Sequence, residues 1–216
     1  MKTIIYDIIT KKGFCILKNI FTIGHSTHEI DYFISLIKQH QINTIVDVRS
    51  IPYSKFTPNY NKEGLKLYLK KNNIQYIFMG DLLGARYEDK NLLFPDGKVN
   101  FKEVQKLKSF QDGITRLEKG IRMGYNISLM CSEKEAFDCH RFGLISEILT
   151  KIGINVKHIY PDKIVSQEEL EKQLIKKYDK KIDYLGLETD KTPIEQAYIL
   201  RNKDIAYNAI TKEGDE

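Results

Sequence analysis

Residues 20–48, IFTIGHSTHEIDYFISLIKQHQINTIVDV, decide the fold. They start with a short apolar run, Ile20–Ile23, and end with a second one, Thr44–Val48, each with the length and composition of a buried strand. Between these runs, His28–His40 carries apolar residues at helical spacing, which predicts a helix. A strand, a helix and a second strand in this order are typical of a parallel sheet. The apolar residues of the helix are Phe33, Leu36 and Ile37.

The rest of the chain continues this alternation. We therefore predict an α/β fold with an open, mostly parallel, five-stranded, Rossmann-like sheet, helices on both faces, and additional C-terminal helices. Further strands are expected at Ile74–Met79, Asn126–Met130 and Asn155–Ile159. Helices are expected at Lys62–Lys71, from Asn100 to Met123 with a break near Ser109, and at Cys139–Ile152, with two more after residue 161.

Polar residues and glycines indicate where helices start and stop. Three pairs have the spacing of a capping box: Ser26 with Glu29, Ser166 with Glu169, and Thr192 with Glu195. Two asparagines are expected to cap helix starts and two glycines to end helices: Asn61, Asn100, Gly124 and Gly153.

The whole chain, residues 1–216, is predicted to form a single α/β domain. Residues 1–19 should add a hairpin or an edge strand, residues 20–160 the core, and residues 161–216 a C-terminal helical extension. The connection from residue 80 to residue 100 is long for a compact domain, so that it is either a lid or binding loop, or a peripheral insertion.

Composition is that of an ordinary globular protein, with 42% apolar and 29% charged residues. No stretch approaches the roughly 18 apolar residues of a membrane helix, and the first apolar run is unlike a signal peptide because Asp7 interrupts it. We therefore expect a cytoplasmic protein with no membrane partner. Three cysteines do not suggest a disulfide framework. A net charge of +5 fits either simple solubility or a weak preference for anionic ligands or nucleic acid.

Candidate site residues follow the predicted strands, because ligands of open parallel sheets bind outside the carboxyl ends of the strands. Reactive and charged side chains gather at these positions. The predicted catalytic residues are Cys131, His25 and Glu133. The predicted substrate-binding residues are Gly24, Ser26, Asp47, Arg49, Ser50, Cys139, His140 and Arg141.

Each of the main candidates has two interpretations. Cys131 lies between a strand and a helix, where the helix N-terminus favours a thiolate nucleophile, but it can also be a small buried residue. Arg49 and Arg141 can clamp an anionic oxygen, or Arg49 can pair internally with Asp47. His25 can transfer protons or simply bond to the backbone.

The same region contains metal-ligating side chains, namely Cys131, Glu133, Cys139, His140 and His25. The chain nevertheless lacks the tight Cys-x2-Cys pair of structural zinc sites, and the adjacent Cys139 and His140 are expected to point to different faces of a helix. We therefore predict no metal. No cofactor is evident either, because the sequence has neither a phosphate loop nor Gly-x-Gly-x-x-Gly after a strand.

Several of these motifs resemble those of the domain of unknown function 488 family. They are Gly24-His25-Ser26, Asp47-Val48-Arg49 with Pro52 and Ser54, Phe56-x-Pro58, and Cys131-x-Glu133 followed by Cys139-His140-Arg141. The resemblance covers roughly residues 21–160. It implies an α/β fold and a site built from these motifs, and it implies no settled activity.

Three functions compete. The first is a cysteine-dependent transferase or hydrolase acting on a small anionic or nucleotide-like substrate. The second is a nucleic-acid-binding or nucleic-acid-processing module, because the segment 53–60 mixes aromatic, basic and hydroxyl side chains. The third is a non-catalytic sensor that binds an anion. The number of reactive side chains favours the enzyme.

Overall fold

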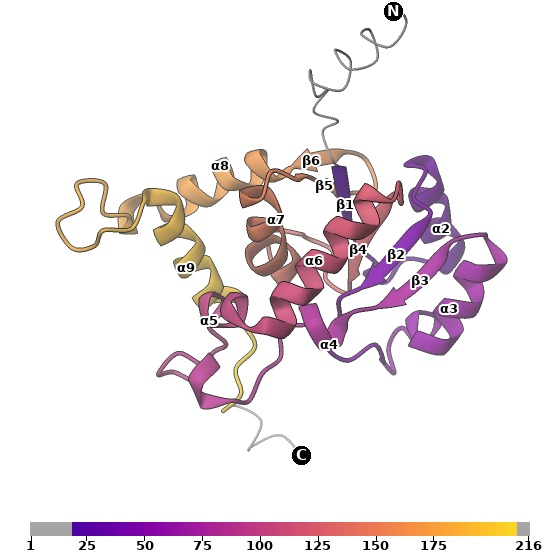
Figure 1. Cartoon of the computed structure of the whole chain (residues 1–216), viewed down its shortest axis with the longest axis horizontal. Helices are drawn as coiled ribbons and strands as arrows, with labels where there is room; N and C mark the ends of the chain where they lie inside the picture. Colours follow the sequence, from indigo (N-terminus) through magenta and orange to yellow (C-terminus); the bar gives the residue numbers. More distant parts are fainter. Residues whose placement is uncertain (1–18, 211–216) are drawn as a thin grey trace, which may run out of the picture.

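The computed structural model describes residues 19–210, so the hairpin or edge strand predicted for residues 1–19 lies almost entirely outside the described residues. In the described part, six strands form one open sheet in the order β3-β2-β4-β1-β5-β6 (Figure 1). Strands β1 to β5 pair in parallel, whereas β6 runs antiparallel to β5 at one edge. The strands are β1 (Asn19–Gly24), β2 (Thr44–Asp47), β3 (Gln75–Phe78), β4 (Ile127–Cys131), β5 (Asn155–Ile159) and β6 (Ile164–Ser166).

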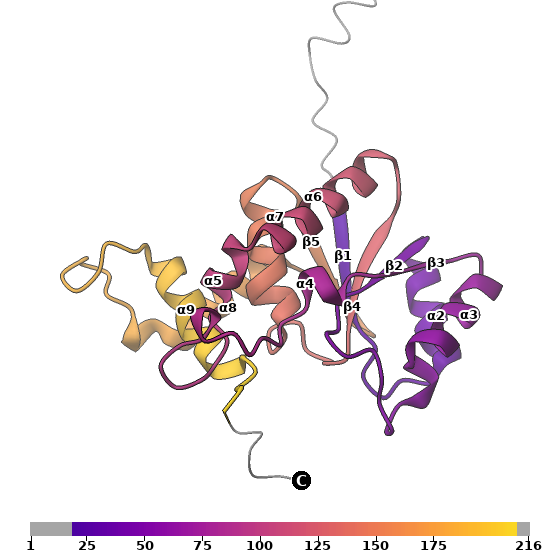
Figure 2. The ribbon, with the colours of Figure 1, turned by 60° about the horizontal axis from the view of Figure 1, so that its bottom comes forward.

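Helices cover both faces of the sheet, as Figure 2 shows. Helices α2 and α3 bury Phe33, Ile37 and Leu65 on one face, and α5, α6 and α7 bury Val104, Phe110 and other side chains on the opposite face. The helices are α2 (Ile30–Gln39), α3 (Lys62–Lys71), α4 (Gly80–Leu83), α5 (Phe101–Lys106), α6 (Lys108–Arg122), α7 (Glu147–Lys151), α8 (Gln167–Tyr178) and α9 (Pro193–Ile205). A π-helix, Arg141–Ser146, precedes α7, and short 3₁₀ helices occupy Pro58–Tyr60, Lys90–Leu92 and Asp179–Lys181.

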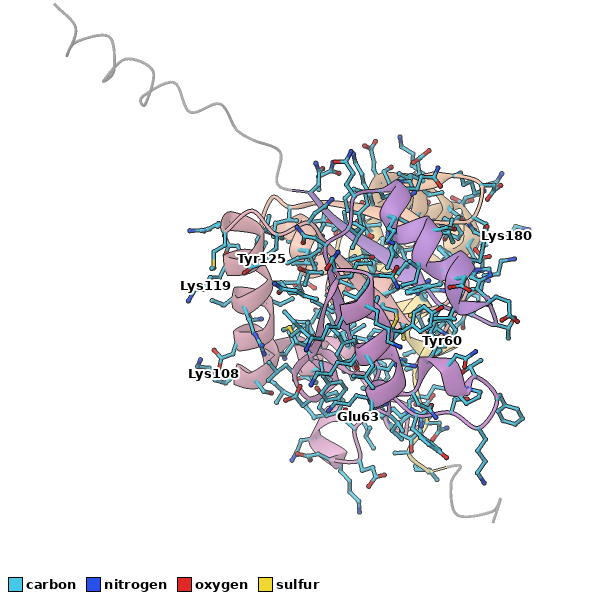
Figure 3. All side chains as sticks on the ribbon, turned by 90° about the vertical axis from the view of Figure 1, so that its right-hand side faces the viewer. Tyr60, Glu63, Lys108, Lys119, Tyr125 and Lys180 are labelled. Carbon is cyan, nitrogen blue, oxygen red and sulfur yellow. The ribbon has the colours of Figure 1, made fainter. Side chains whose placement is uncertain are left out.

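Helix α6 illustrates why the sequence folds in this way. Its residues Phe110, Ile114 and Leu117 recur at helical spacing and are buried against the sheet. Lys108 and Lys119 lie on the other side of the helix and point away from the body of the molecule (Figure 3). Burial of one apolar stripe therefore fixes both the helix and its orientation.

The C-terminal helices α8 and α9 are tied to the sheet by a buried chain of hydrogen bonds. The Thr22 hydroxyl of β1 lies 2.8 Å from Nδ1 of His158 in β5, and His158 Nε2 lies 2.9 Å from the Gln167 amide oxygen. The Gln167 amide donates to the Tyr198 hydroxyl of α9, which donates to Glu171. Since an amide oxygen only accepts, His158 carries a proton on Nε2. Burial lowers the pKa of this ring to about 3, so the ring is neutral.

The predicted open, mostly parallel α/β sheet with C-terminal helices is confirmed. The sixth strand, β6, was not expected, because three residues are too few to show a period. The long connection is also less irregular than its composition suggests: it contains α4, a 3₁₀ turn and a bridge between Leu93 and Val99. Among residues 19–210, none of the helices combines the length and the apolar character that crossing a membrane requires.

Two details of the helix starts are wrong. Ser26 is not an N-cap: its φ is +49°, its backbone amide bonds to the Ser132 carbonyl, and α2 begins only at Ile30. Asn61 stands at the N-cap position of α3, but its side chain accepts a hydrogen bond from the Ser54 amide instead.

The other helix boundaries agree with expectation apart from two. The helix expected to begin at Cys139 starts at Arg141 instead, as a π-helix. Both C-terminal capping boxes are confirmed, as is the Asn100 cap, whose side chain accepts from the Lys102 amide. Gly124 and Gly153 adopt positive φ after their helices. The break between α5 and α6 falls at Leu107 rather than near Ser109.

Candidate functional site

The topology creates a crevice at the carboxyl ends of β1 and β4. These strands are neighbours in the sheet, but the chain leaves β1 toward β2 and leaves β4 toward β5, on opposite sides. The two connections also pack on opposite faces, with α2 on one and α7 on the other. Ligands of open α/β sheets bind at such a switch point. Gly24-His25 and Cys131-Ser132 both emerge there.

The loops after β1 and β4 lie in close contact. The His25 amide donates to the Cys131 carbonyl, and the Ser26 amide donates to the Ser132 carbonyl, both at 2.9 Å. A Cβ atom on Gly24 would lie 2.0 Å from the Glu133 carbonyl oxygen, so only glycine fits at this position. Gly24 therefore acts through its small size, which lets the segment that carries Glu133 pack onto the end of β1.

A cleft of about 240 Å³ opens beside these loops. It is lined by Cys131, Cys139 and His140, by the buried Arg49 and by the exposed Arg86. The volume falls below the range of about 300–1,000 Å³ that is typical of sites for drug-sized ligands. It suits a small substrate, or the anionic end of a larger one.

Four polar side chains converge on the wall of this cleft. The ligand-type atoms of Cys131, Glu133, Cys139 and His140 all lie within 4.8 Å of one another. His140 Nδ1 lies 3.7 Å from Sγ of both Cys131 and Cys139, and the Cys139 thiol donates to Glu133 Oε2 at 3.0 Å. Cys131 and Cys139 are buried, whereas the Glu133 side chain is exposed.

The backbone fixes how His140 presents itself. Its Nε2 lies 3.2 Å from the Val48 carbonyl, which only accepts, so Nε2 carries a proton. Nδ1 therefore turns toward the two sulfur atoms. Burial by itself would lower the pKa of His140, but the nearby Cys139 and Glu133 raise it overall. The neighbourhood thus favours positive charge on this ring, or a cation beside it.

The other two groups of this cluster respond to the same surroundings. Burial raises the pKa of the Cys139 thiol well above its usual range. Although Glu133 as a residue is exposed, its carboxyl group lies against Cys139, and the loss of water there would raise its pKa. The charge of His140 and hydrogen bonds from Cys131 and Cys139 nevertheless lower this pKa to about 2. Glu133 is therefore a carboxylate, whereas Cys139 is a thiol unless a cation replaces its proton.

Arg49 is held by Asp47 in a buried pair. Its Nε and Nη2 donate to the two carboxylate oxygens of Asp47 at 2.9 and 2.6 Å, and Nη2 also donates to the Tyr60 carbonyl. Tyr76 donates its hydroxyl to Asp47 as well. Arg49 therefore lines the cleft, but most of its donors are engaged within the protein.

His25 contacts Arg49 and does not line the cleft. Its Nδ1 donates to the Ser26 carbonyl at 2.8 Å, and its Nε2 accepts from Arg49 Nη1 at 3.1 Å. The ring stacks on Tyr60 at 4.1 Å. Burial and the charge of Arg49 lower the pKa of His25 to about 4, so the ring is neutral with both nitrogens engaged.

Arg141 is buried behind the same cluster, with 1% of its surface exposed. Its Nη2 donates to the Lys134 carbonyl, whereas Nε and Nη1 have no hydrogen-bond partner within residues 19–210. An unpartnered buried guanidinium is costly. It places a positive charge next to Cys139 and His140, and this charge partly opposes the rise in their pKa values.

The structure divides the predicted site residues into two groups. One group lines the cleft: Arg49, Ser50, Cys131, Glu133, Cys139 and His140. The other group lies behind it and holds the first in place: Gly24, His25, Ser26, Asp47 and Arg141.

Sequence reasoning missed two residues of the rim. Arg86 and Tyr207 line the cleft, and the Arg86 guanidinium lies 5.3 Å from the centre of the Tyr207 ring. The Ser50 hydroxyl positions this part of the long connection by accepting hydrogen bonds from the Ala85 and Arg86 amides. Arg86 lies in the long connection that was expected to be either a lid or binding loop, or a peripheral insertion.

The premise against a metal site is wrong. Cys139 and His140 do not point to different faces of a helix, since their ligand atoms lie 3.7 Å apart. The reason is local: the Cys139 amide closes a turn on Ala136, so Cys139 precedes the regular helix, and a π-helix begins at Arg141. The residues could hold one ion together with Cys131 and Glu133.

A protein-family model matches the part of the chain that carries most of this site. The family described as domain of unknown function DUF488 matches residues 29–148, which is more than half of the chain. The chain belongs to the DUF488 family. The match includes Arg49 and the entire segment from Cys131 to Arg141. No curated protein and no solved structure matches this DUF488 chain.

Proposed function

We propose that this DUF488 protein is an enzyme that acts on a small anionic substrate, or on the anionic end of a nucleotide-like one, in the cleft at the carboxyl ends of β1, β2 and β4. The observation that carries the proposal is the convergence of two thiols, an imidazole and a carboxylate within 4.8 Å at the wall of that cleft. Such a density of reactive groups at a switch point is typical of a catalytic centre.

Positive charge at the rim supports an anionic substrate. Arg86 is exposed at the cleft and makes no ion pair within residues 19–210. Its planar guanidinium can bind a carboxylate or phosphate oxygen in a two-pronged manner. Arg49 adds a second positive charge on the same side. In this arrangement Arg86 binds the substrate, and Arg49 mainly contributes positive electrostatic potential to the cleft.

The cluster itself supplies the chemistry. Glu133 is the exposed member and the one available for proton transfer at the cleft surface. Cys131 is only 3% exposed, and its Sγ lies 3.7 Å from His140 Nδ1, which can receive its proton. The predicted role of Cys131 as a nucleophile depends on access to this buried sulfur.

Binding and turnover are tested separately. We expect inorganic phosphate or adenosine monophosphate to bind the wild-type protein in calorimetric titration, and Arg86→Ala to weaken binding by about 10-fold or more, since a charge-assisted hydrogen bond contributes roughly 1.5–3 kcal/mol. Arg116→Ala is the matched control, because Arg116 lies on the exposed surface of α6, away from the cleft.

Turnover is assayed by mass spectrometry on pooled nucleotides, sugar phosphates and carboxylates. We expect wild-type protein to consume at least one anionic compound, and Glu133→Gln to lose that activity. Binding without any turnover would contradict the proposal and would favour the non-catalytic anion sensor.

A second function is favoured by one observation outside the cleft. The Phe56 side chain is 96% exposed and Tyr53 is 64% exposed, with the exposed Lys55 between them. The Ser54 hydroxyl accepts hydrogen bonds from the Phe56 and Thr57 amides, so the loop holds its aromatic side chain outward. Exposed aromatic and basic side chains of this kind stack on and contact single-stranded nucleic acid.

Fluorescence anisotropy with a labelled thymine oligonucleotide tests this second function. We expect binding that weakens steeply as salt increases, and Phe56→Ala to weaken it by about 1–3 kcal/mol. Leu67→Ala, which removes an exposed apolar side chain on α3, is the control. Absence of binding at low salt would exclude this function.

A further inference from the structure

The four side chains at the cleft wall have the composition of a metal centre. Two cysteine sulfurs, one imidazole nitrogen and one carboxylate oxygen are the donors that proteins use for zinc. They come from a single segment of ten residues, Cys131 to His140, and lie at the end of a central strand. Their spacing along the chain is not that of a zinc finger. Instead, the turn before the π-helix brings Cys139 and His140 to the same side.

The distances fit one tetrahedral ion. Zinc bonds of about 2.3 Å to sulfur and 2.0–2.1 Å to nitrogen separate these two ligands by roughly 3.6 Å in a tetrahedron. His140 Nδ1 lies 3.7 Å from each of the two sulfur atoms. The Cys139 Sγ to Glu133 Oε2 distance of 3.0 Å is shorter than such an edge, and the exposed Glu133 can move outward.

The orientation of His140 is the one a metal ligand requires. Its Nε2–H is directed to the Val48 carbonyl, which leaves the lone pair of Nδ1 facing the sulfurs. Metal-bound histidines almost always donate their second ring N–H to a carbonyl or carboxylate in this manner. The Val48 carbonyl therefore already orients His140 as a metal-bound histidine is oriented.

The charges behind the cluster favour an anionic ligand set. Two deprotonated cysteines and Glu133 around a divalent ion carry a net charge of −1. Arg141 has two unpartnered nitrogens, and its charge acts on Cys139 and His140, whereas the charge of Arg49 interacts with Cys131. An anionic centre would compensate the buried charge of Arg141, which forms no ion pair within residues 19–210.

We propose that Cys131, Cys139 and His140 bind a Zn²⁺ ion, with Glu133 as the fourth group on the cleft side. The proposal deepens the proposed function, on which it rests only for the role of the ion in turnover. Because Glu133 is the exposed member, it is the ligand that water or a substrate oxygen can displace. Such an ion acts as a Lewis acid toward that oxygen.

Cobalt substitution tests the site independently of any substrate. Full-length protein is freed of metal with a chelator under reducing conditions and titrated with Co²⁺. We expect saturation at one ion per chain, with the visible spectrum of tetrahedral cobalt and a thiolate charge-transfer band, and displacement by Zn²⁺. Cys131→Ser and Cys139→Ser should each lower the charge-transfer intensity to about half or less, since each removes one of two thiolates.

Two further variants keep the test independent of folding defects. Cys15→Ser, the third cysteine, should leave the spectrum unchanged. Glu133→Gln, at an exposed position, should retain the thiolate charge-transfer band but bind Zn²⁺ more weakly.

The outcomes separate the two proposals. A folded wild-type protein that shows no tetrahedral cobalt spectrum overturns the metal site, whether or not turnover is found. A Cys131- and Cys139-dependent spectrum supports the site, and absence of turnover in that case contradicts only the proposed enzyme.

Discussion

Replacing Gly24 by alanine tests how closely the loop after β4 packs onto the end of β1. The new Cβ would lie 2.0 Å from the Glu133 carbonyl oxygen and 3.0 Å from Arg141 Nη1. The backbone of Glu133 must therefore retreat by about 1 Å, which moves the exposed member of the cluster. Overpacking of this kind costs roughly 1–3 kcal/mol of unfolding free energy.

Gly64→Ala is the matched control, because it makes the same chemical change where a Cβ meets nothing within 4 Å. Gly64 lies within α3, so alanine should stabilise the protein by up to about 1 kcal/mol. The two variants are therefore expected to change the unfolding free energy in opposite directions. Urea unfolding followed by circular dichroism measures both, and an unchanged slope against urea shows that only stability has changed.

Gly24→Ala should also impair the site. We expect weaker Co²⁺ binding in the folded variant than in Gly64→Ala, because Glu133 no longer lies beside Cys139. Equal stability and equal metal binding in the two variants would refute the close packing of Gly24 against Glu133.

Three further expectations follow from buried groups and from the exposed loop. Asp47→Asn leaves Arg49, which is 4% exposed, without its counter-charge, and should lower the unfolding free energy by about 3–5 kcal/mol. Tyr76→Phe removes only a hydrogen bond to Asp47 and should lower it by about 1 kcal/mol. Urea unfolding measures both, and equal losses would show that the Asp47–Arg49 pair does not hold the loop. Burial lowers the pKa of His158 to about 3, so that the unfolded chain binds the extra proton. Stability therefore falls as pH decreases from about 6.5 toward 3, by about 1.6 kcal/mol between pH 6.5 and 5. His158→Gln should flatten this acid limb in unfolding curves measured across that range, and an unaltered limb would contradict the assignment. Phe56→Ala should change thermal stability by less than about 0.5 kcal/mol, because the side chain is 96% exposed, and a larger loss would show that it packs in the folded state.

The sheet was predictable because its central strands are buried on both faces. Ile20–Ile23 is continuously apolar or β-branched, Thr44–Val48 is interrupted only by Asp47, and β2 is buried along its whole length. The order of the strands could not be predicted from these runs. It depends on which helix covers which face, and it is what brings β4 between β1 and β2.

The residues of the candidate site were predictable as a set, but their roles were not. Cys131 and Arg49 follow strands and were expected at the same edge of the sheet, where they now line the cleft. His25 and Arg141 also follow strands as polar residues, yet they lie behind the cleft and donate hydrogen bonds to backbone carbonyls. Their direction is set by contacts across the fold, which spacing along the chain does not encode.

The errors have local physical causes. Ser26 was expected to cap α2, but its amide is needed to extend the pairing between the loops after β1 and β4. Cys139 and His140 were expected to diverge as neighbours in a regular helix, but a turn before the π-helix brings both to one side. Arg86 was overlooked because a single hydroxyl, that of Ser50, determines where its loop lies.

The presence of a zinc ion in the cleft is tested by a crystal structure of zinc-treated protein, with anomalous scattering recorded on both sides of the zinc absorption edge. We expect a single strong anomalous peak between the Cys131 and Cys139 sulfurs and His140 Nδ1, at zinc bond lengths of about 2.3 Å and 2.0–2.1 Å. Absence of a peak between these side chains, or a peak bound only by surface histidines, would contradict it.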